Sequence, residues 1–235
     1  MHVQFENIVR QRIENEEWVP NFMIPSENEL SKMYGISRMT VRGVLNRIVS
    51  AGLLYRVPGK GTFVAEEKIE SRPLSYMGIR EQLEQMGYQI TTKLLSIDTI
   101  DAPVRVAKLL GLPKNAPVYK LSRVRFIKGQ PLSIHVSYLS TALAPRLEEK
   151  DLMGTQLCDI LEHEYNHPIL RQEETLESAL PSTEEAETLK LTEPSPLLLL
   201  ENIFYTHSNT PIEYSRVVFR GDKIKIRLEY GKPAE

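Results

Sequence analysis

The sequence predicts two domains of different fold class: a small N-terminal domain of three helices and a β-hairpin, and a larger C-terminal α+β domain built around an antiparallel sheet. Three observations support this. Between Ser31 and Val64 the chain has six basic residues and no Asp or Glu, although its formal net charge is −2. The hydrophobic residues of the first third follow a helical period. The remainder contains pairs of strand-like runs joined by short turns.

The first two helices are short and have clear ends. Residues 3–17 predict the first, because apolar residues recur there at roughly helical spacing with charged residues between them. The segment Ser26–Glu29 has the S-x-x-E pattern of a capping box, which predicts that the second helix starts there. Gly35 closes that helix, since glycine is favoured just past a helix end. Ser37 can cap a third helix that runs to about Ala51.

The third helix has the clearest hydrophobic pattern in the chain. Five apolar residues at i, i+3, i+4, i+7 and i+8 form one buried stripe: Val41, Val44, Leu45, Ile48 and Val49. Two short helices joined by a tight glycine-containing turn make a helix-turn-helix, whose second helix can enter the DNA major groove. Arg38 and Arg42 lie near the start of that helix, and arginine suits guanine O6 and N7.

A β-hairpin is expected after the third helix. Leu53–Val57 and Thr62–Val64 are short β-rich runs around the turn Pro58–Gly61, with Lys60 at the tip. The strand-then-helix context and full spacing of a nucleotide-binding P-loop are absent, so the hairpin is better interpreted as a wing that touches a DNA groove or a phosphate. The acid-free stretch carries +6 and leaves the rest of the chain at −8, as a phosphate-facing surface in an acidic protein requires.

The rest of the chain predicts a linker and one α+β domain. Residues 66–73 are charged, lack a hydrophobic pattern and end in proline, so they indicate a linker between domains at 1–65 and 74–235. In the second domain we expect helices over 74–86, 103–110, 156–165 and 183–191, and strands over 93–100, 118–127, 132–139, 170–179, 197–207, 211–220 and 223–230. Three hairpins are expected among these strands, and because they outnumber βαβ units the sheet should be antiparallel.

Composition excludes several classes of protein. The hydrophobic fraction of 41% is that of an ordinary globular protein, and no apolar run approaches the roughly 20 residues of a membrane span. The N-terminus lacks the pattern of a signal peptide. The single cysteine, Cys158, cannot form an internal disulfide, which favours a cytoplasmic location. No pair of carboxylates and no Ser/His/Asp set indicates catalysis, and we expect no cofactor.

The first 65 residues resemble the winged helix-turn-helix domain of GntR-type bacterial transcription regulators. The motifs that carry the resemblance are Ile24–Leu30, Tyr34–Arg42 and Gly59–Val64. It implies binding of double-stranded operator DNA through the start of the third helix and through the wing. The expected DNA-binding residues are Ser26, Lys32, Ser37, Arg38, Thr40, Arg42, Arg47, Gly59, Lys60 and Gly61. One departure is Pro20–Met23, where the family usually has glycine in a tight turn.

Residues 72–230 resemble more loosely the UTRA effector domain of the HutC branch of these regulators, which has a chorismate lyase-like fold. The resemblance is carried by Leu121–Arg125, Ser137–Leu139, Glu213 and Phe219–Asp222. It implies a homodimer on a palindromic operator and a small anionic metabolite, a sugar phosphate or a carboxylate, that switches a regulator, most often a repressor.

The expected effector site centres on two arginines. Arg123 and Arg125 stand two apart on one expected strand, so both face one side and could clamp a phosphate or carboxylate. The resemblance adds Glu213 as an acceptor for ligand hydroxyl groups. It also points to three departures from the family pattern: His135 in place of a glutamate, Phe219 in place of a tyrosine, and Arg80 near the usual phosphate-binding pair.

Two weaker features and two alternative functions stay open. His163 and His167 have a helical metal-ligand spacing, but Pro168 follows at once and no further ligand cluster is evident, so no metal is expected. Cys158 lies among apolar residues and is better interpreted as a buried structural thiol than a reactive one. Besides a ligand-responsive regulator, the chain could be an architectural DNA-binding dimer without an effector, or an enzyme related to a lyase.

Overall fold

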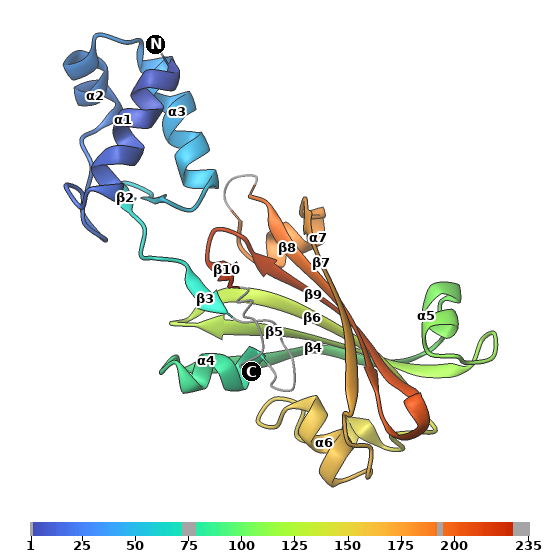
Figure 1. The fold of residues 1–235 in the computed structure, drawn as a ribbon. Coiled ribbons are helices and arrows are strands. Elements are labelled where there is room, and N and C mark those ends of the chain that lie inside the picture. Colours follow the sequence, from blue (N-terminus) through green and yellow to red (C-terminus); the bar gives the residue numbers. More distant parts are fainter. Residues whose placement is uncertain (1, 72–78, 192–194, 228–235) are drawn as a thin grey trace, which may run out of the picture.

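The N-terminal part is a three-helix unit with a β-hairpin, as expected. The computed structural model describes residues 2–71, 79–191 and 195–227. Its first elements are α1 (His2–Glu14), α2 (Glu27–Tyr34), α3 (Arg38–Ser50), β1 (Leu54–Val57) and β2 (Gly61–Val64), shown in blue to cyan in Figure 1. β1 and β2 pair antiparallel, with Leu54 opposite Val64.

The helix ends of the helix-turn-helix are those that the sequence specifies. The Ser26 hydroxyl accepts a hydrogen bond from the Glu29 amide, and the Glu29 carboxylate accepts one from the Ser26 amide at 2.8 Å, which completes the capping box. Gly35 ends α2 with φ +65°, a left-handed conformation that favours glycine. The Ser37 hydroxyl caps α3 by accepting from the Thr40 amide. Local side chains therefore fix where α3 begins.

Residues 20–23, where the family usually has a glycine, pair with strand β2 of the wing. The Asn21 amide donates to the Val64 carbonyl at 2.9 Å, and Met23 forms an isolated β-bridge with Phe63. Asn21 adopts φ +66°. Asparagine tolerates this left-handed conformation better than most residues, so it can replace glycine there.

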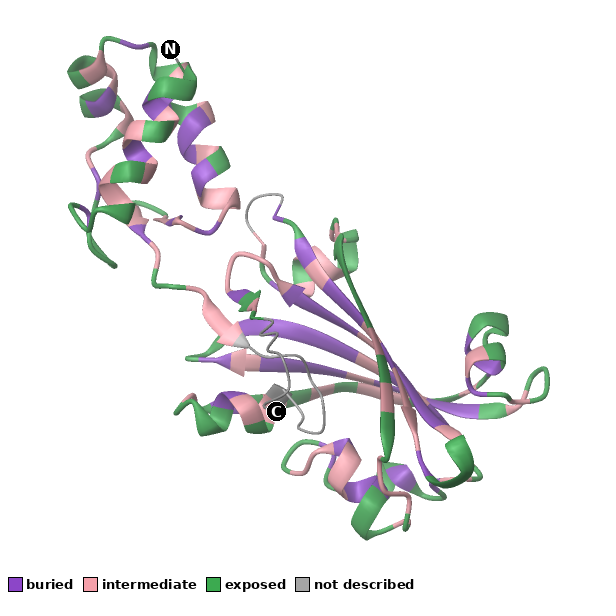
Figure 2. Cartoon of the chain, in the orientation of Figure 1, coloured by how far each residue is buried: buried purple, intermediate pink, exposed green. Residues whose placement is uncertain are grey.

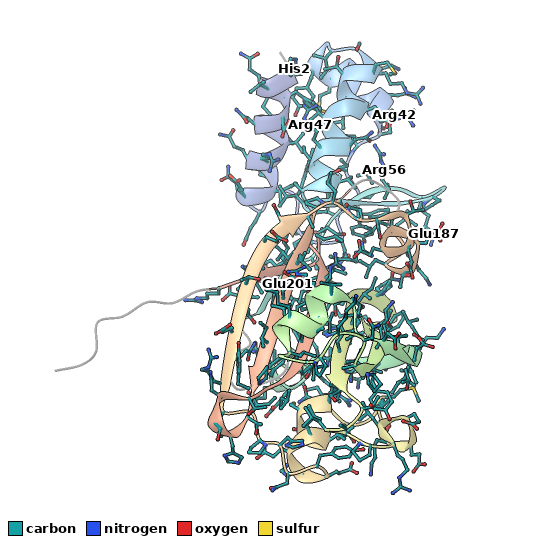
Figure 3. The ribbon with its side chains drawn as sticks, turned by 90° about the vertical axis from the view of Figure 1, so that its right-hand side faces the viewer. His2, Arg42, Arg47, Arg56, Glu187 and Glu201 are labelled. Carbon is teal, nitrogen blue, oxygen red and sulfur yellow. The ribbon has the colours of Figure 1, made fainter. Side chains whose placement is uncertain are left out.

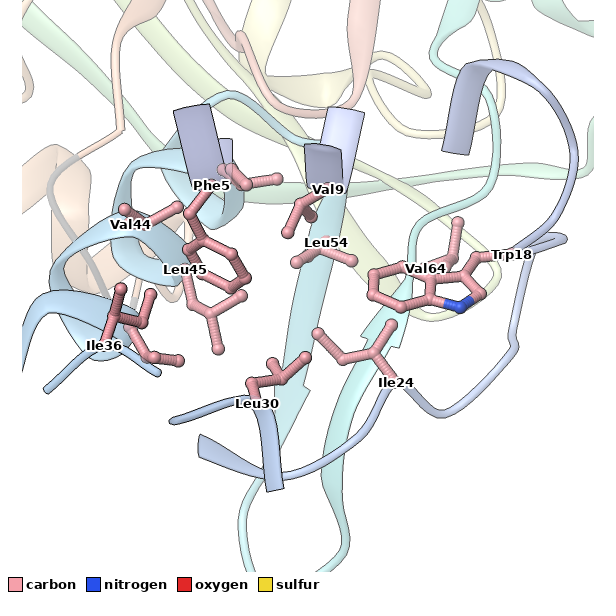
Figure 4. Close-up of a cluster of buried hydrophobic side chains, with 12 residues drawn as sticks. Phe5, Val9, Trp18, Ile24, Leu30, Ile36, Val44, Leu45, Leu54 and Val64 are labelled. Carbon is pink, nitrogen blue, oxygen red and sulfur yellow. The ribbon is translucent and has the colours of Figure 1, made fainter. Parts of the chain in front are cut away.

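A single hydrophobic core holds the three helices against the hairpin. Val41, Val44, Leu45 and Ile48 of α3 are at most 1% exposed, whereas Val49 is half-buried at its edge. The stripe meets α1, α2 and both strands through the side chains drawn in Figure 4: Phe5, Val9, Trp18, Ile24, Leu30, Leu54 and Val64. The orientation of α3 is thus set by its buried side, which leaves the opposite side free.

Replacing Leu45 with alanine should destabilise this unit. Leu45 is 1% exposed and lies inside the cluster, so its loss leaves a cavity and should lower the unfolding free energy by about 2–5 kcal/mol. Denaturant unfolding followed by circular dichroism would measure it. Met39→Ala is the control, since Met39 is 76% exposed on the same helix and should change stability by less than about 0.5 kcal/mol. Equal effects of the two substitutions would contradict this packing.

The C-terminal part is built on one six-stranded antiparallel sheet, in the order β4-β5-β6-β9-β8-β7. Its strands are β4 (Ile90–Asp101), β5 (Pro117–Ile127), β6 (Gln130–Ser140), β7 (Arg171–Ala179), β8 (Leu197–Tyr205) and β9 (Pro211–Arg220). The helices are α4 (Ile79–Gln85), α5 (Val104–Leu109), α6 (Leu157–His163) and α7 (Thr183–Thr188). The α+β class and antiparallel sheet are confirmed, although residues 74–78 of the first expected helix lie outside the described residues.

The two faces of this sheet have different partners, which Figure 1 and the burial colours of Figure 2 make visible. On one face, Leu121 of β5 packs with Leu157 and Ile160 of α6, and Phe219 of β9 packs with Leu83 of α4. The other face forms a separate cluster with residues that follow α7, built from Val124, Ile134, Leu189, Leu197, Leu199 and Val218. Since strand side chains alternate between faces, Arg123 and Arg125 share the face of Leu121.

Two details of the expected topology were wrong. The segment 66–73, interpreted as a linker, contains β3 (Ile69–Ser71), and β10 (Ile224–Ile226) does not form a third hairpin with β9 but pairs parallel with β3. The reason is long-range: the Ile69 amide donates to the Lys223 carbonyl at 2.8 Å, and Ile224 is buried in the cluster that Ile69 flanks.

Within the described residues, no helix is both long and apolar enough to cross a membrane.

Candidate functional sites

The start of α3 presents the basic side chains that the sequence assigns to DNA. Arg38, Arg42, Met39 and Ser37 are all exposed. Arg42 projects from the outer side of α3 (Figure 3), and it forms no ion pair with any residue that the structure describes. The Ser37 and Thr40 hydroxyls lie 2.9 Å apart, so part of their hydrogen-bonding capacity is used locally. The exposed end of α3 can therefore face a groove with two guanidinium groups.

Glu27 is a residue of this surface that the sequence argument missed. Its carboxylate lies 3.4 Å from Arg38 Nε and 3.6 Å from Arg56 Nη2, so it joins the start of α3 to strand β1 of the wing. The only signal in the sequence was its place in the capping-box segment, where it would usually be given a helix-end role. Its geometry indicates that it orients Arg38 before DNA is bound.

The other expected DNA-binding residues differ in whether residues of the chain already bind their side chains. Arg47 is held against α1, where its Nη2 lies 2.8 Å from a carboxylate oxygen of Glu6 (Figure 3). Ser26 is occupied by its capping box, whereas Lys32 is exposed. Lys60 is exposed at the tip of the wing.

The wing tip depends on glycine. Gly59 has φ +74° and Gly61 has φ +137°, conformations that other residues rarely adopt. At Gly61 an added Cβ would also lie 3.3 Å from Met23 Sδ. The backbone around Lys60 can thus approach a partner closely.

A second candidate site is a cavity of about 170 Å³ on the α4 and α6 face of the sheet. It is lined by four residues expected from the sequence, Arg123, Arg125, His135 and Glu213. The strand register brings them together, because Arg123 pairs with His135, and His135 with Val217, across β5, β6 and β9. Further lining residues were not foreseen: Glu81, Ser137, Gln156, Leu157, Cys158, Asp159, Glu162, Ile169, Gln172, Asn202, Phe204, Ser215 and Val217.

The unforeseen polar residues of the strands had a signal in the sequence. Ser137 follows the expected residue His135 at an alternate position of β6, and Ser215 follows Glu213 in the same way on β9, with apolar residues between them. Polar residues on the inner face of a buried strand are unusual, so this alternation marks a functional cavity.

The two arginines are buried without enough partners. Arg123 and Arg125 are 4% and 6% exposed, and Arg123 Nε, Arg125 Nε and Arg125 Nη1 have no hydrogen-bond acceptor among the described residues. Burial, and then the neighbouring charge of Arg123, lowers the pKa of Arg125 to about 9, which still leaves it charged at neutral pH. Buried N–H donors without acceptors are costly, so this site is ready for an anion.

The other buried polar side chains of the cavity, His135 and Glu213, carry less charge than the two arginines. Burial, together with the charges of Arg125 and Arg123, lowers the pKa of His135 well below its usual value, so its imidazole is neutral, and Ser133 Oγ lies 2.9 Å from its Nε2. Burial raises the pKa of Glu213, against the opposing effects of a hydrogen bond from Ser137 and of the arginine charges. The floor therefore has more positive than negative charge.

Two expected effector residues do not line this cavity. The charge of Arg80 contributes to the lowered pKa of Arg125, but its own donors hold α4 in place: its Nε donates to Glu84 at 2.7 Å, and its Nη1 donates to the carbonyls of Met153 and Gly154. Phe219 is fully buried beneath Leu83 of α4 and contacts His135 edge-on, with the ring centroids 6.0 Å apart. Phe219 can therefore position the imidazole but does not reach a ligand from where it lies.

The structure also shows where the remaining candidate residues, Cys158, His163 and His167, lie. Cys158 is half-buried in the cavity wall, not in the core, and burial raises its pKa to about 12, so it stays a protonated thiol. His163 is the last residue of α6 and His167 lies beyond it. No group of three or more His, Cys, Asp or Glu side chains among the described residues is placed to hold a metal ion.

Known proteins resemble this chain over both parts. Residues 3–64 match the model of bacterial regulatory proteins of the gntR family, and residues 85–225 match that of the UTRA domain. The HTH-type transcriptional repressor NagR of Bacillus subtilis is 32% identical over 95% of this chain and 91% of its own length. The histidine utilization repressor of Pseudomonas putida is 26% identical over 99% and 92%. The crystal structure of PhnF from Mycobacterium smegmatis superimposes with a TM-score of 0.67 at 25% identity, covering 97% of this chain and 99% of that one.

Proposed function

This chain belongs to the gntR family of bacterial regulatory proteins and is a transcription repressor with a UTRA domain, and from this premise we propose how it is switched. A homodimer binds a palindromic operator, with one α3 helix in each half-site. A small anionic metabolite, a sugar phosphate or a carboxylate, binds the cavity and changes operator affinity. The observation that carries this proposal is the buried pair Arg123 and Arg125, of which Arg123 Nε, Arg125 Nε and Arg125 Nη1 have no acceptor among the described residues.

The family assignment rules out the enzyme alternative, since its members are regulators. The second alternative, an architectural dimer without an effector, would have no use for two buried guanidinium groups that keep unsatisfied donors beneath a cavity. We propose a cytoplasmic location, since a regulator of this kind works where the chromosome is.

The exposed apolar side chains at the edge of the sheet offer a contact surface for a second copy of the chain. β7 is an edge strand of the six-stranded sheet, and it and its flanks expose three large apolar side chains: Leu170, Leu176 and Leu180. Unpaired edge strands with apolar side chains favour association. We therefore place the dimer contact near β7.

Strand β9 offers a route between the cavity and the DNA-binding part. Glu213, Ser215 and Val217 line the cavity, and the turn at Arg220–Asp222 that follows contacts the turn after α3. Lys68, which precedes β3, lies beside this contact and donates from its Nζ to the Gly221 carbonyl at 2.7 Å. Arg220 holds the turn through two hydrogen bonds to Asp222 at 3.0 and 2.6 Å. A ligand that shifts β9 would therefore move the end of α3.

Gly52→Ala should break this contact. A Cβ at Gly52 would lie 2.6 Å from the Asp222 carbonyl oxygen, and the residue has φ +77°. We expect the amides of residues 220–223 to exchange with solvent roughly tenfold faster in this variant, because local opening of the turn becomes easier. Gly87→Ala is the matched control, since Gly87 has φ +85° but no neighbour within 4 Å of the added Cβ. If both variants exchange alike, backbone strain explains the change and the contact does not.

The function is tested by screening phosphorylated sugars and small carboxylates for a change in operator affinity, using fluorescence anisotropy. At least one should change the affinity by about 5-fold to 150-fold, the usual range of allosteric coupling. If no anion in the panel changes it while the DNA-binding variants behave as expected, the architectural alternative holds.

A further inference from the structure

The mouth of the effector cavity carries carboxylates that no described residue neutralises. Glu81 of α4 and Asp159 and Glu162 of α6 all line the cavity. Glu81 and Glu162 are exposed and Asp159 is half-buried, so they lie toward solvent while the arginines lie deep. Within the described residues none of the three has a cationic partner, and the contact of Asp159 is with the Cys158 thiol at 3.7 Å.

The cavity is therefore polarised: two arginines lie at its floor beside Glu213, and at its mouth lie three carboxylates that have no cationic partner among the described residues. A ligand that is only anionic would satisfy Arg123 and Arg125 but would bring its negative charge past three carboxylates. Like charges that are brought together on binding oppose it, whereas complementary charges favour it. A second, positive group on the ligand removes that cost.

The wall between floor and mouth is polar and already ordered. Gln172 Nε2 donates to Asn202 Oδ1 at 2.9 Å, and Asn202 Nδ2 donates to Ser215 Oγ at 3.3 Å, so three neighbouring strands present one row of amide and hydroxyl groups. Such a row suits hydroxyl groups on the body of a ligand. A volume of about 170 Å³ admits roughly a dozen water-sized groups, at ~10–15 Å³ each.

We infer that the effector is zwitterionic: a small polar molecule with a phosphate or carboxylate on Arg123 and Arg125 and a cationic amine near Glu81, Asp159 and Glu162. This inference rests on the proposed function, because it concerns the same cavity. It adds that the amine selects the ligand, since the arginines alone would accept any anion of suitable size.

The test compares ω-aminoalkyl phosphates of increasing chain length with alkyl phosphates of the same lengths, by calorimetry on the full chain. The best aminoalkyl phosphate should bind at least tenfold more tightly than its alkyl counterpart. The combined variant Glu81→Gln, Asp159→Asn and Glu162→Gln should remove that advantage. Its charge-matched control is Glu177→Gln, Glu184→Gln and Glu187→Gln, three carboxylates that do not line the cavity and should leave the advantage intact.

The outcomes separate this inference from the proposed function. Equal affinities of the two series in the wild type, with both lost in Arg125→Met, would overturn the zwitterion and leave an anionic effector standing. An advantage that survives in the combined variant would also overturn it. If neither series binds the wild type, the anionic site itself is refuted and the inference falls with it.

Discussion

Replacing both Arg38 and Arg42 with alanine is expected to abolish most specific operator binding. Both side chains are exposed at the start of α3, on the side opposite the buried stripe. If each reads a base, each is worth about 1–3 kcal/mol, so the pair should cost roughly 30-fold to 25,000-fold in affinity for the operator. Anisotropy titrations with operator and scrambled DNA at fixed salt would measure the loss, which should be much smaller on scrambled DNA.

Lys60→Ala is the informative comparison for this prediction. Lys60 lies on the exposed wing and is expected to contact a phosphate, so its loss should weaken binding to all sequences alike and reduce the salt dependence. Arg47→Ala should have little effect, since Arg47 already pairs with Glu6. Unchanged operator binding in the Arg38 and Arg42 double variant would contradict the assignment of α3.

Arg125→Met is expected to remove ligand binding and at the same time to stabilise the unliganded protein. Arg125 is 6% exposed, and its Nε and Nη1 have no acceptor among the described residues. Replacing such a buried charge, whose donors are incompletely satisfied, by an apolar side chain of similar length should raise the unfolding free energy by about 1–4 kcal/mol. Thermal unfolding with and without an anionic ligand measures both effects, because only the wild type should gain stability from the ligand.

Arg80→Met provides the control for that result. Arg80 bonds to Glu84 and to two loop carbonyls outside the cavity, so the substitution should lower stability slightly and preserve ligand binding. Loss of ligand binding in Arg80→Met would instead support the role that the sequence suggested for it. A destabilised Arg125→Met that still binds the ligand would contradict the cavity as described.

The parts of the fold that the sequence predicted well are those that local interactions determine. Ser26 and Ser37 mark helix starts because their own hydroxyl groups accept amide hydrogen bonds three residues on, and Gly35 marks a helix end by its left-handed backbone. The buried stripe of α3 follows from the helical period alone. These signals extend over a few residues, so the sequence displays them directly.

The parts that were missed depend on residues far apart in the chain. The pairing of β3 with β10 joins Ile69 to Ile224, and no local pattern indicates that partner. The position of Arg80 is set by loop carbonyls more than seventy residues away, and that of Phe219 by α4, which covers it. The carboxylates Glu81, Asp159 and Glu162 line the cavity only because the fold brings α4 and α6 beside the arginines.

Operator affinity measured with and without a saturating anionic effector tests the central claim most directly, namely that the Arg123 and Arg125 cavity controls DNA binding. In the wild type the effector should change the affinity at least about fivefold, and operator should change effector affinity by the same factor, as linkage requires. In Arg125→Met the operator affinity should be unaffected by the effector. An effector that binds this cavity yet leaves wild-type operator affinity unchanged would contradict the account.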